Sequence, residues 1–420
     1  MTPLAGLRVL ELARILAGPW IGQTLADLGA DVVKVEAPEG DDTRRWGPPF
    51  IERGDRSATG ARRGAAEGIP RSAEGATWGA SGGATDGSSA TREAAYFHCC
   101  NRGKRSVIAD FRTSAGQDFV RALAKRSDVL IENFKVGGLA KYGLDYASLH
   151  ALNPRLVYCS VTGFGQNGPK SGHAGYDLMI QGMSGVMDLT GDPAGPPQKL
   201  GVAFADIFTG TYGVIAIQAA LAQRARTGLG QHIDMALLDT MVAVLGNQAL
   251  NYLASGEIPH RLGNAHPNIV PYQVFEVRDG HVIVAVGNDQ QYRQFCAVIK
   301  RPELATDPRF LTNADRVGNR PILIEAITLA LRDVTRAELL PALEARGVPC
   351  GPINSVPEAF AEPQVVARKV RIDLPAPDTP SGAIPSLRTP IVFSDATLAL
   401  QRPAPRLGEH TDEVMREIGG

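Results

Sequence analysis

The chain has 420 residues, of which 44% are hydrophobic and 21% charged, and its formal net charge is -1. This length exceeds what one compact core usually holds, so we expect more than one domain. The balanced charge gives no basic field for nucleic acid or an anionic membrane, and neither is expected as a partner.

The cysteines follow no metal-ligand or disulfide spacing. They are Cys99, Cys100, Cys159, Cys296 and Cys350. We expect no metal and no tightly bound cofactor. The first residues lack a basic region followed by an apolar core, and no uninterrupted apolar run is long enough to span a membrane. The sequence therefore predicts a cytoplasmic protein with reduced thiols.

The first forty residues read as a strand, a helix and a second strand. Leu7–Leu12 and Asp31–Glu36 are short apolar runs, and a helical pattern from Pro19 to Leu25 lies between them. This β-α-β pattern predicts an α/β fold with a doubly wound, Rossmann-like parallel sheet. The first turn, Ala17-Gly18-Pro19, is not a GxGxxG fingerprint, so a nicotinamide dinucleotide site has little support.

Residues 53–94 differ from the rest in composition. They are nearly all Gly, Ala, Ser, Thr, Arg and Glu, with Ile69 and Trp78 as large apolar side chains. Such a stretch buries too little surface to offset its ordering entropy, which predicts a flexible insertion. An arginine-bearing, partner-binding arm is the alternative.

The strand and helix alternation then resumes. We expect strands at 105–110, 128–132 and 156–162, and helices at 115–125 and 146–152, before a glycine-rich loop at 163–169. Further on, strands are expected at 272–277 and 281–286, helices at 290–299, 322–332 and 336–346, and a turn at 350–354. The predicted domains are a large domain at 1–229, a smaller α+β domain at 230–330, and a segment at 331–420 that returns to the large domain.

One acidic residue, Asp206, separates a small apolar run from a long helical pattern. From Ile207, apolar residues recur three and four apart until Thr227-Gly228, where the helix has its stop signal. Asp206 is therefore expected at the N-terminus of this helix, where partial positive charge favours an ionised carboxylate. Two compatible roles are open: a helix N-cap, or a covalent nucleophile toward an activated acyl group.

Many segments of the chain match one family in the same order. They include LAGLRVLELARILAGP, LADLGADVVKVEAP, NRGKRSVIADF, SDVLIENFKVGGLAKYGLDY, LNPRLVYCSVTGFGQNGP, AGYDLMIQGMSGVM and FADIFTGTYG. On these segments, and outside residues 53–94, the chain resembles the class III CoA-transferases, also called the CaiB/BaiF family. The resemblance implies an interlocked homodimer with Asp206 as the catalytic aspartate. It also implies a mixed anhydride and an aspartyl-CoA thioester as covalent intermediates.

The resemblance further implies that coenzyme A or acyl-CoA binds as a substrate. The matching positions are Leu16, Ala17, Ala109, Asp110, Phe111, Arg112, Asn133, Phe134, Lys135, Lys141, Ala174, Gly175, Tyr176 and Asp177. Lys135, Lys141 and Arg112 would be cations for the phosphates. Ala37 stands where the formyl-CoA enzyme has an arginine, with Lys34 or Arg44 as substitutes. Backbone N–H groups of Gly263-Asn264-Ala265 are candidate oxyanion donors.

The family contains transferases and racemases. Its racemases have a histidine where this chain has Tyr176, and an unperturbed tyrosine is a poor base near neutral pH. This favours CoA transfer to a small carboxylic acid. The segment GNAHPNIVPYQVF most resembles the branch that uses succinyl-CoA and dicarboxylates, for which Arg45 or Arg261 would hold the second carboxylate. A catalytically silent CoA-binding scaffold is a third hypothesis.

Overall fold

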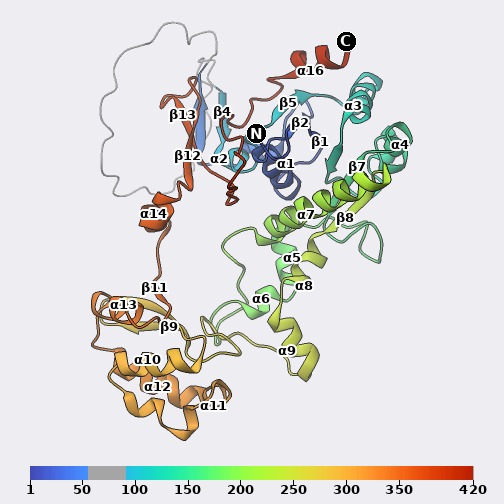
Figure 1. The fold of residues 1–420 in the computed structure, drawn as a ribbon. Coiled ribbons are helices and arrows are strands. Elements are labelled where there is room, and N and C mark those ends of the chain that lie inside the picture. Colours follow the sequence, from blue (N-terminus) through green and yellow to red (C-terminus); the bar gives the residue numbers. More distant parts are fainter. Residues whose placement is uncertain (55–90, 420) are drawn as a thin grey trace. The chain divides into compact units, whose positions relative to one another are not determined.

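The computed structural model describes residues 1–54 and 91–419, and the chain forms two compact units (Figure 1). The first unit comprises Met1–Gly175, Ala205–Leu237 and Lys369–Gly420. The second comprises Tyr176–Phe204 and Leu238–Arg368. Compared with the predicted boundaries, residues 176–204 belong to the second unit, and the return to the first unit falls at Lys369 instead of residue 331.

A six-stranded parallel sheet organises the first unit. Its strands are β1 (Arg8–Glu11), β2 (Asp31–Glu36), β5 (Arg105–Ile108), β6 (Val129–Glu132), β7 (Val157–Thr162) and β8 (His232–Ala236). They lie in the order β5-β2-β1-β6-β7-β8, and each neighbouring pair is parallel. The order reverses between β1 and β6, which makes the carboxyl ends of these two strands the switch point where doubly wound sheets bind ligands.

Helices cover both faces of this sheet. They are α1 (Ala17–Asp27), α3 (Ser114–Arg126), α4 (Tyr146–Leu152) and α7 (Phe204–Thr227). Leu130 of β6 belongs to a buried cluster with residues of α3 and α4, whereas its neighbour Ile131 approaches Gly18 of α1. Because successive side chains of a strand point to opposite faces, α1 and the α3–α4 pair cover opposite sides of the sheet.

The long helix α7 packs closely against α1. A Cβ added to Gly210 would stand 2.8 Å from the Ala17 carbonyl oxygen, and one added to Gly213 would stand 2.5 Å from Ile21. The two glycines lie three residues apart on one face of α7, and because they lack side chains, α1 can pack closely against this face. Contrary to the sequence expectation, α7 is long and apolar enough to cross a membrane. This is weak evidence for a membrane span, because core helices of water-soluble proteins meet the same criteria.

The ends of the predicted insertion are regular structure. Strand β3 (Phe50–Arg53) pairs antiparallel with β4 (Thr91–Ala94). Arg53 is buried, and its Nε lies 2.9 Å from Asp378, just after β12 (Arg371–Pro375), which pairs with β13 (Ala383–Leu387). The expectation of flexibility is therefore wrong for Arg53 and for 91–94. Residues 55–90 lie outside the described part of the chain.

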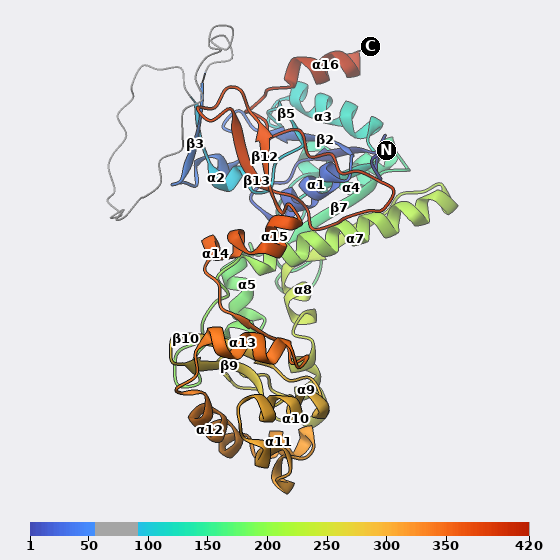
Figure 2. The same cartoon turned by 60° about the vertical axis from the view of Figure 1, so that its left-hand side comes forward.

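The second unit has its own core. Its sheet has the order β11-β10-β9, with β9 (Tyr272–Val277), β10 (Gly280–Ala285) and β11 (Cys350–Pro352) antiparallel. Around β9 and β10 lie α10 (Asp289–Val298), α11 (Asn313–Gly318), α12 (Arg320–Leu331) and α13 (Arg336–Glu344) (Figure 2). The predicted turn at 350–354 is wrong at its start, because Cys350 joins the sheet edge.

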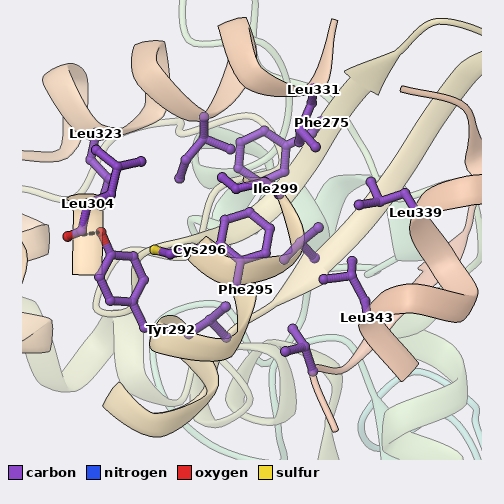
Figure 3. Packing of buried hydrophobic residues seen from close by; sticks show 14 of the residues in the cluster. Phe275, Tyr292, Phe295, Cys296, Ile299, Leu304, Leu323, Leu331, Leu339 and Leu343 are labelled. Atoms are coloured by element: carbon purple, nitrogen blue, oxygen red, sulfur yellow. Dashed lines mark hydrogen bonds between the residues drawn. The ribbon is translucent and has the colours of Figure 1, made fainter. Parts of the chain in front are cut away.

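Aromatic and leucine side chains fill this second core (Figure 3). Phe275 of β9 and Phe295 of α10 are buried between leucines of α12 and α13. The hydroxyl of Tyr292 donates to the Leu304 carbonyl oxygen at 3.1 Å, which satisfies the one polar atom this ring carries into the core.

The second unit also contains shorter helices. They are α5 (Asp177–Met183), α6 (Val186–Leu189), α8 (Leu237–Ala243), α9 (Asn247–Ser255), α14 (Val356–Ala361) and α15 (Pro363–Ala367). The first residue of α8, Leu237, is assigned to the first unit.

Candidate functional site

Two loops meet at the switch point of the parallel sheet. The Asn133 side chain, just after β6, accepts from the Arg14 N–H at 2.9 Å and donates to the Arg14 carbonyl at 2.6 Å. The next residue, Ile15, has a φ of 72°, which is rare for a β-branched side chain. Leu16 and Ala17 follow and are buried. Strained backbone held by such contacts is frequent at ligand sites.

Aromatic rings join three of the predicted CoA-contacting segments. The Phe111 ring lies 6.1 Å from that of Phe134 and 6.5 Å from that of Tyr142, measured between centroids. The Lys141 Nζ stands 4.7 Å from the Tyr142 ring centroid. The structure therefore brings the segment 109–112, the turn after β6 and Lys141 together, within the first unit.

The three cations predicted for phosphates differ in their surroundings. Arg112 already binds Asp110 at 2.8 Å and approaches Glu39 at 3.9 Å, which neutralises much of its charge. Its hydrogen bond to Asp110 lowers the pKa of that carboxyl. Within residues 1–54 and 91–419, Lys135 and Lys141 form no ion pair. These two lysines are the better candidates for holding phosphate.

The two residues named as substitutes for an adenine-side arginine have other partners. Lys34 is fully buried, and its Nζ lies 3.1 Å from Glu11 and 3.0 Å from Asp41. Arg44 is buried, binds Glu36 at 2.7 Å and lies over the Phe97 ring. That hypothesis is corrected: both cations belong to a buried ionic network and are not presented to a ligand.

Asp206 lies in the first turn of α7. The helix begins at Phe204, so Asp206 is its third residue and not the N-cap that one hypothesis required. The dipole of a helix favours negative charge in its first turn. Asp206 is half-buried, and Gly210, one turn later, packs on Ala17. The start of α7 is therefore fixed beside the first predicted CoA-contacting turn.

The glycine-rich loop after β7 is closed by two glycines. A Cβ on Gly163 would stand 2.5 Å from the Gly175 Cα, so the two backbones touch. Ala174 precedes this contact. Tyr176 and Asp177 follow it and belong to the second unit, where Tyr176 is 64% exposed and Asp177 accepts from Gln181 at 2.7 Å.

The residues proposed for substrate binding in the second unit have partners within it. The Ala265 N–H donates to the Leu262 carbonyl oxygen, so it is not available as an oxyanion donor. Arg261 donates to Asp188 at 2.9 Å, which neutralises one of the two candidate cations for a second carboxylate. Arg45, the other candidate, is exposed after β2 in the first unit.

Sequence reasoning missed a polar cluster beneath the turn after β6. Glu132, Ser160 and His232 are neighbours on β6, β7 and β8, and they line a cavity of about 310 Å³. The signal in the sequence is weak: Glu132 ends an apolar strand pattern, and only strand pairing shows that it faces Ser160.

The comparisons with known proteins agree with this geometry. Residues 4–411 match the model of CoA-transferase family III, and the chain belongs to this family. It is 52% identical over 417 residues to the succinate–glutarate CoA-transferase of Agrobacterium fabrum (strain C58), covering 99% of this chain and 96% of that protein.

Two further relatives extend the likeness. The succinyl-CoA:glutarate CoA-transferase of Mus musculus is 37% identical over 419 residues, covering 100% of this chain and 87% of that protein. A crystal structure of a CaiB/BaiF family protein from Brucella suis superposes with a TM-score of 0.80 at 55% identity, covering 99% of both chains. The protein is accordingly a CoA-transferase enzyme of this family.

Proposed function

We propose that the protein transfers coenzyme A from succinyl-CoA to a dicarboxylic acid, with Asp206 as the nucleophile. The observation that carries the proposal is the position of Asp206 in the first turn of α7, one turn before Gly210, which packs on Ala17 at the switch point. The substrates are inferred from the relatives, whose names include succinate–glutarate and succinyl-CoA:mesaconate CoA-transferase.

The chemistry follows from an ionised carboxylate near a thioester. An Asp206 oxygen attacks the thioester carbonyl, the C–S bond breaks, and the products are an aspartyl mixed anhydride and CoA thiolate. The thiolate then attacks the aspartyl carbonyl, which releases the first acid and leaves an aspartyl-CoA thioester. The acceptor carboxylate attacks this thioester and expels CoA thiolate, which gives a second mixed anhydride. The thiolate then attacks the acceptor's carbonyl in this anhydride, and the products are the new acyl-CoA and free Asp206.

The CoA site of the proposal lies at the switch point. Lys135 and Lys141 hold phosphate groups, because among the described residues neither is neutralised by a carboxylate. Phe111, Phe134 and Tyr142 give an aromatic surface beside them. Ala109, Asp110, Asn133 and the segment Ala174–Asp177 complete the set that the family resemblance implies.

We also propose a homodimer with interlocked chains. Large apolar side chains are exposed in the second unit and on α7, which is typical of a surface that another chain covers. They include Tyr176, Leu178, Met179, Tyr212, Ile215, Leu250, Leu253 and Ile258. The cytoplasm remains the proposed location, in keeping with five free thiols.

The direct test is mass analysis of the protein mixed with succinyl-CoA. A transferase traps CoA on Asp206 as a hydroxylamine-sensitive adduct, and Asp206→Asn loses both the adduct and at least about a thousand-fold of turnover. Asp118→Asn, an exposed pair partner of Arg121, is the matched control and keeps both. Exchange of the substrate α-proton with deuterated water without CoA transfer would favour a racemase, and CoA binding without either reaction would leave the scaffold hypothesis.

A further inference from the structure

Three polar side chains, Glu132, Ser160 and His232, lie together under the turn after β6. The Ser160 Oγ is 2.9 Å from the His232 Nε2, and the pairing of β6 with β7 sets Ser160 opposite Glu132. The Glu132 Oε2 accepts from the Phe134 N–H at 2.7 Å. Glu132 therefore holds the backbone of the turn that the proposed function assigns to CoA.

The surroundings of Glu132 disfavour its ionised form. Glu132 is 5% exposed, and within the described residues no cation forms an ion pair with it. Burial raises its pKa from 4.5 to about 7, although the bonds from Ser160 and Phe134 oppose this. Burial also lowers the pKa of His232, so its imidazole is neutral at pH 7. Among the titratable and charged groups around these three side chains are Lys135, Asp145, Tyr146, Tyr158, Cys159 and Asp234.

The turn that Glu132 holds is coupled to the first turn of the sheet. Asn133 bonds both backbone polar groups of Arg14, and the strained Ile15 follows directly. A small displacement at Phe134 therefore moves Asn133, and with it the backbone that leads to Leu16 and Ala17.

We propose that Glu132, Ser160 and His232 form a proton-linked relay that positions the turn Asn133–Lys135 and so sets the affinity for acyl-CoA. The inference rests on the proposed CoA site. Glu132 and Ser160 are positioning residues, because they act through the Phe134 backbone and through Asn133. The cavity lined by Glu132 and His232 gives the proton its path to water.

The relay has two arrangements. With Glu132 protonated, its O–H donates to the Ser160 Oγ, and the Ser160 O–H donates to the His232 Nε2. When Glu132 gives its proton to water, the Ser160 O–H turns to the carboxylate. His232 then loses its Nδ1 proton to water and takes a proton from water on Nε2, and the Nε2–H donates to the Ser160 Oγ. The Phe134 N–H then bonds an ionised acceptor, which is the stronger bond and holds the turn more firmly.

The test compares the wild-type protein with Glu132→Gln, which imitates the protonated arrangement at every pH. As the pH rises through about 7, we expect the dissociation constant for CoA to fall about three- to ten-fold more in the wild type than in Glu132→Gln. Titration of CoA itself is common to both proteins and cancels. The KM for acyl-CoA should change with pH in the same way as the dissociation constant, whereas kcat should show no such change near pH 7. Glu276→Gln, an exposed carboxylate of β9, keeps the wild-type profile.

A second measurement does not depend on the proposed function. Infrared difference spectra, wild type minus Glu132→Gln, show the carboxylic acid band of protonated Glu132, which disappears with a midpoint near pH 7. If Glu132→Gln does not fold, Ser160→Ala takes its place. In that variant the carboxylic acid band of Glu132 should disappear at a higher pH than in the wild type. Identical pH profiles of CoA binding in both proteins, or a band that titrates like an exposed carboxyl, would overturn the relay. If the wild-type protein does not transfer CoA at all, the proposed function is overturned, whatever the outcome for the relay.

Discussion

The backbone of Gly210 in α7 lies directly against the Ala17 carbonyl oxygen in α1, with no room for a Cβ between them. This contact fixes the start of α7, and with it Asp206, beside the first turn after β1. The proposed nucleophile and the predicted CoA-contacting turn are therefore positioned by the packing of two helices, and not by a loop.

Gly210→Ala tests this contact. The added Cβ would meet a backbone oxygen at 2.8 Å, which no side-chain rotation relieves, so α7 must shift. We expect a loss of about 1–3 kcal/mol in the free energy of unfolding and a lower kcat/KM, measured by urea denaturation and by the transferase assay. Gly318→Ala in α11, where nothing lies within 4 Å, is the control and stabilises by up to about 1 kcal/mol. Equal behaviour of the two variants would contradict the proposed packing role.

Local patterns predicted most of the regular structure of the parallel sheet. Asp31–Glu36 is a strand with the predicted bounds, and the helix predicted from Ile207 to Thr227 is α7. Its start was misplaced by three residues, because Phe204 and Ala205 continue the helix upstream of Asp206. The single acidic residue resembled a cap, since propensity alone does not show where the first helical hydrogen bond forms.

Long-range pairing could not be predicted in the same way. Nothing in the sequence around Lys34 and Arg44 indicates that these cations are buried. Only the fold shows that they are, and that they form ion pairs with Glu11 and Glu36. Glu132 ends a strand as predicted, but the sequence does not give its neighbours, because its bond with Phe134 and its pairing with Ser160 depend on the fold. The family resemblance implies the segments of the predicted CoA site, whereas the structure shows the contact between Phe111 and Tyr142.

The core of the second unit gives a prediction on one helix. Leu323 of α12 is fully buried, whereas Leu329 on the same helix is 54% exposed. Leu323→Ala should lower the free energy of unfolding of this unit by about 2–5 kcal/mol, since it removes methyl groups and leaves a cavity. Leu329→Ala should cost below about 1 kcal/mol. Thermal unfolding followed by near-ultraviolet circular dichroism distinguishes the two, and similar losses would mean that Leu323 is not a core residue.

The buried carboxyl of Glu132 makes stability depend on pH. Its pKa is raised from 4.5 to about 7 on folding, so its contribution to stability is full below about pH 4.5 and is lost as the pH rises through about 7. This shift corresponds to about 3 kcal/mol. Glu132→Gln removes this dependence, so the difference in unfolding free energy between the variant and the wild type should grow in favour of the variant from about pH 5 to about pH 8. A difference that stays constant in urea titrations across this range would show that Glu132 has an ordinary pKa in the fold.

The last prediction separates a structural role of Lys34 from a role in CoA binding. Burial alone would lower the pKa of Lys34, but Asp41, Glu11 and Glu36 raise it above its ordinary value, so the ammonium stays charged in the core. Its Nζ also donates to the Ala13 carbonyl at 2.7 Å, next to the first turn. Lys34→Met keeps most of the side-chain volume and removes the charge.

Because this substitution leaves Glu11 and Asp41 short of a buried partner, we expect it to lower the free energy of unfolding by about 3–5 kcal/mol. Lys135→Met is the matched variant at a lysine that, in the described part of the chain, has no carboxylate partner. It should leave stability within about 0.5 kcal/mol and raise the KM for acyl-CoA. Urea denaturation and the transferase assay, run on both variants, separate the two roles. A stable Lys34→Met protein with weakened acyl-CoA binding would return Lys34 to the list of ligand-contacting cations, whereas an unstable one with normal binding in its folded fraction would place it in the core.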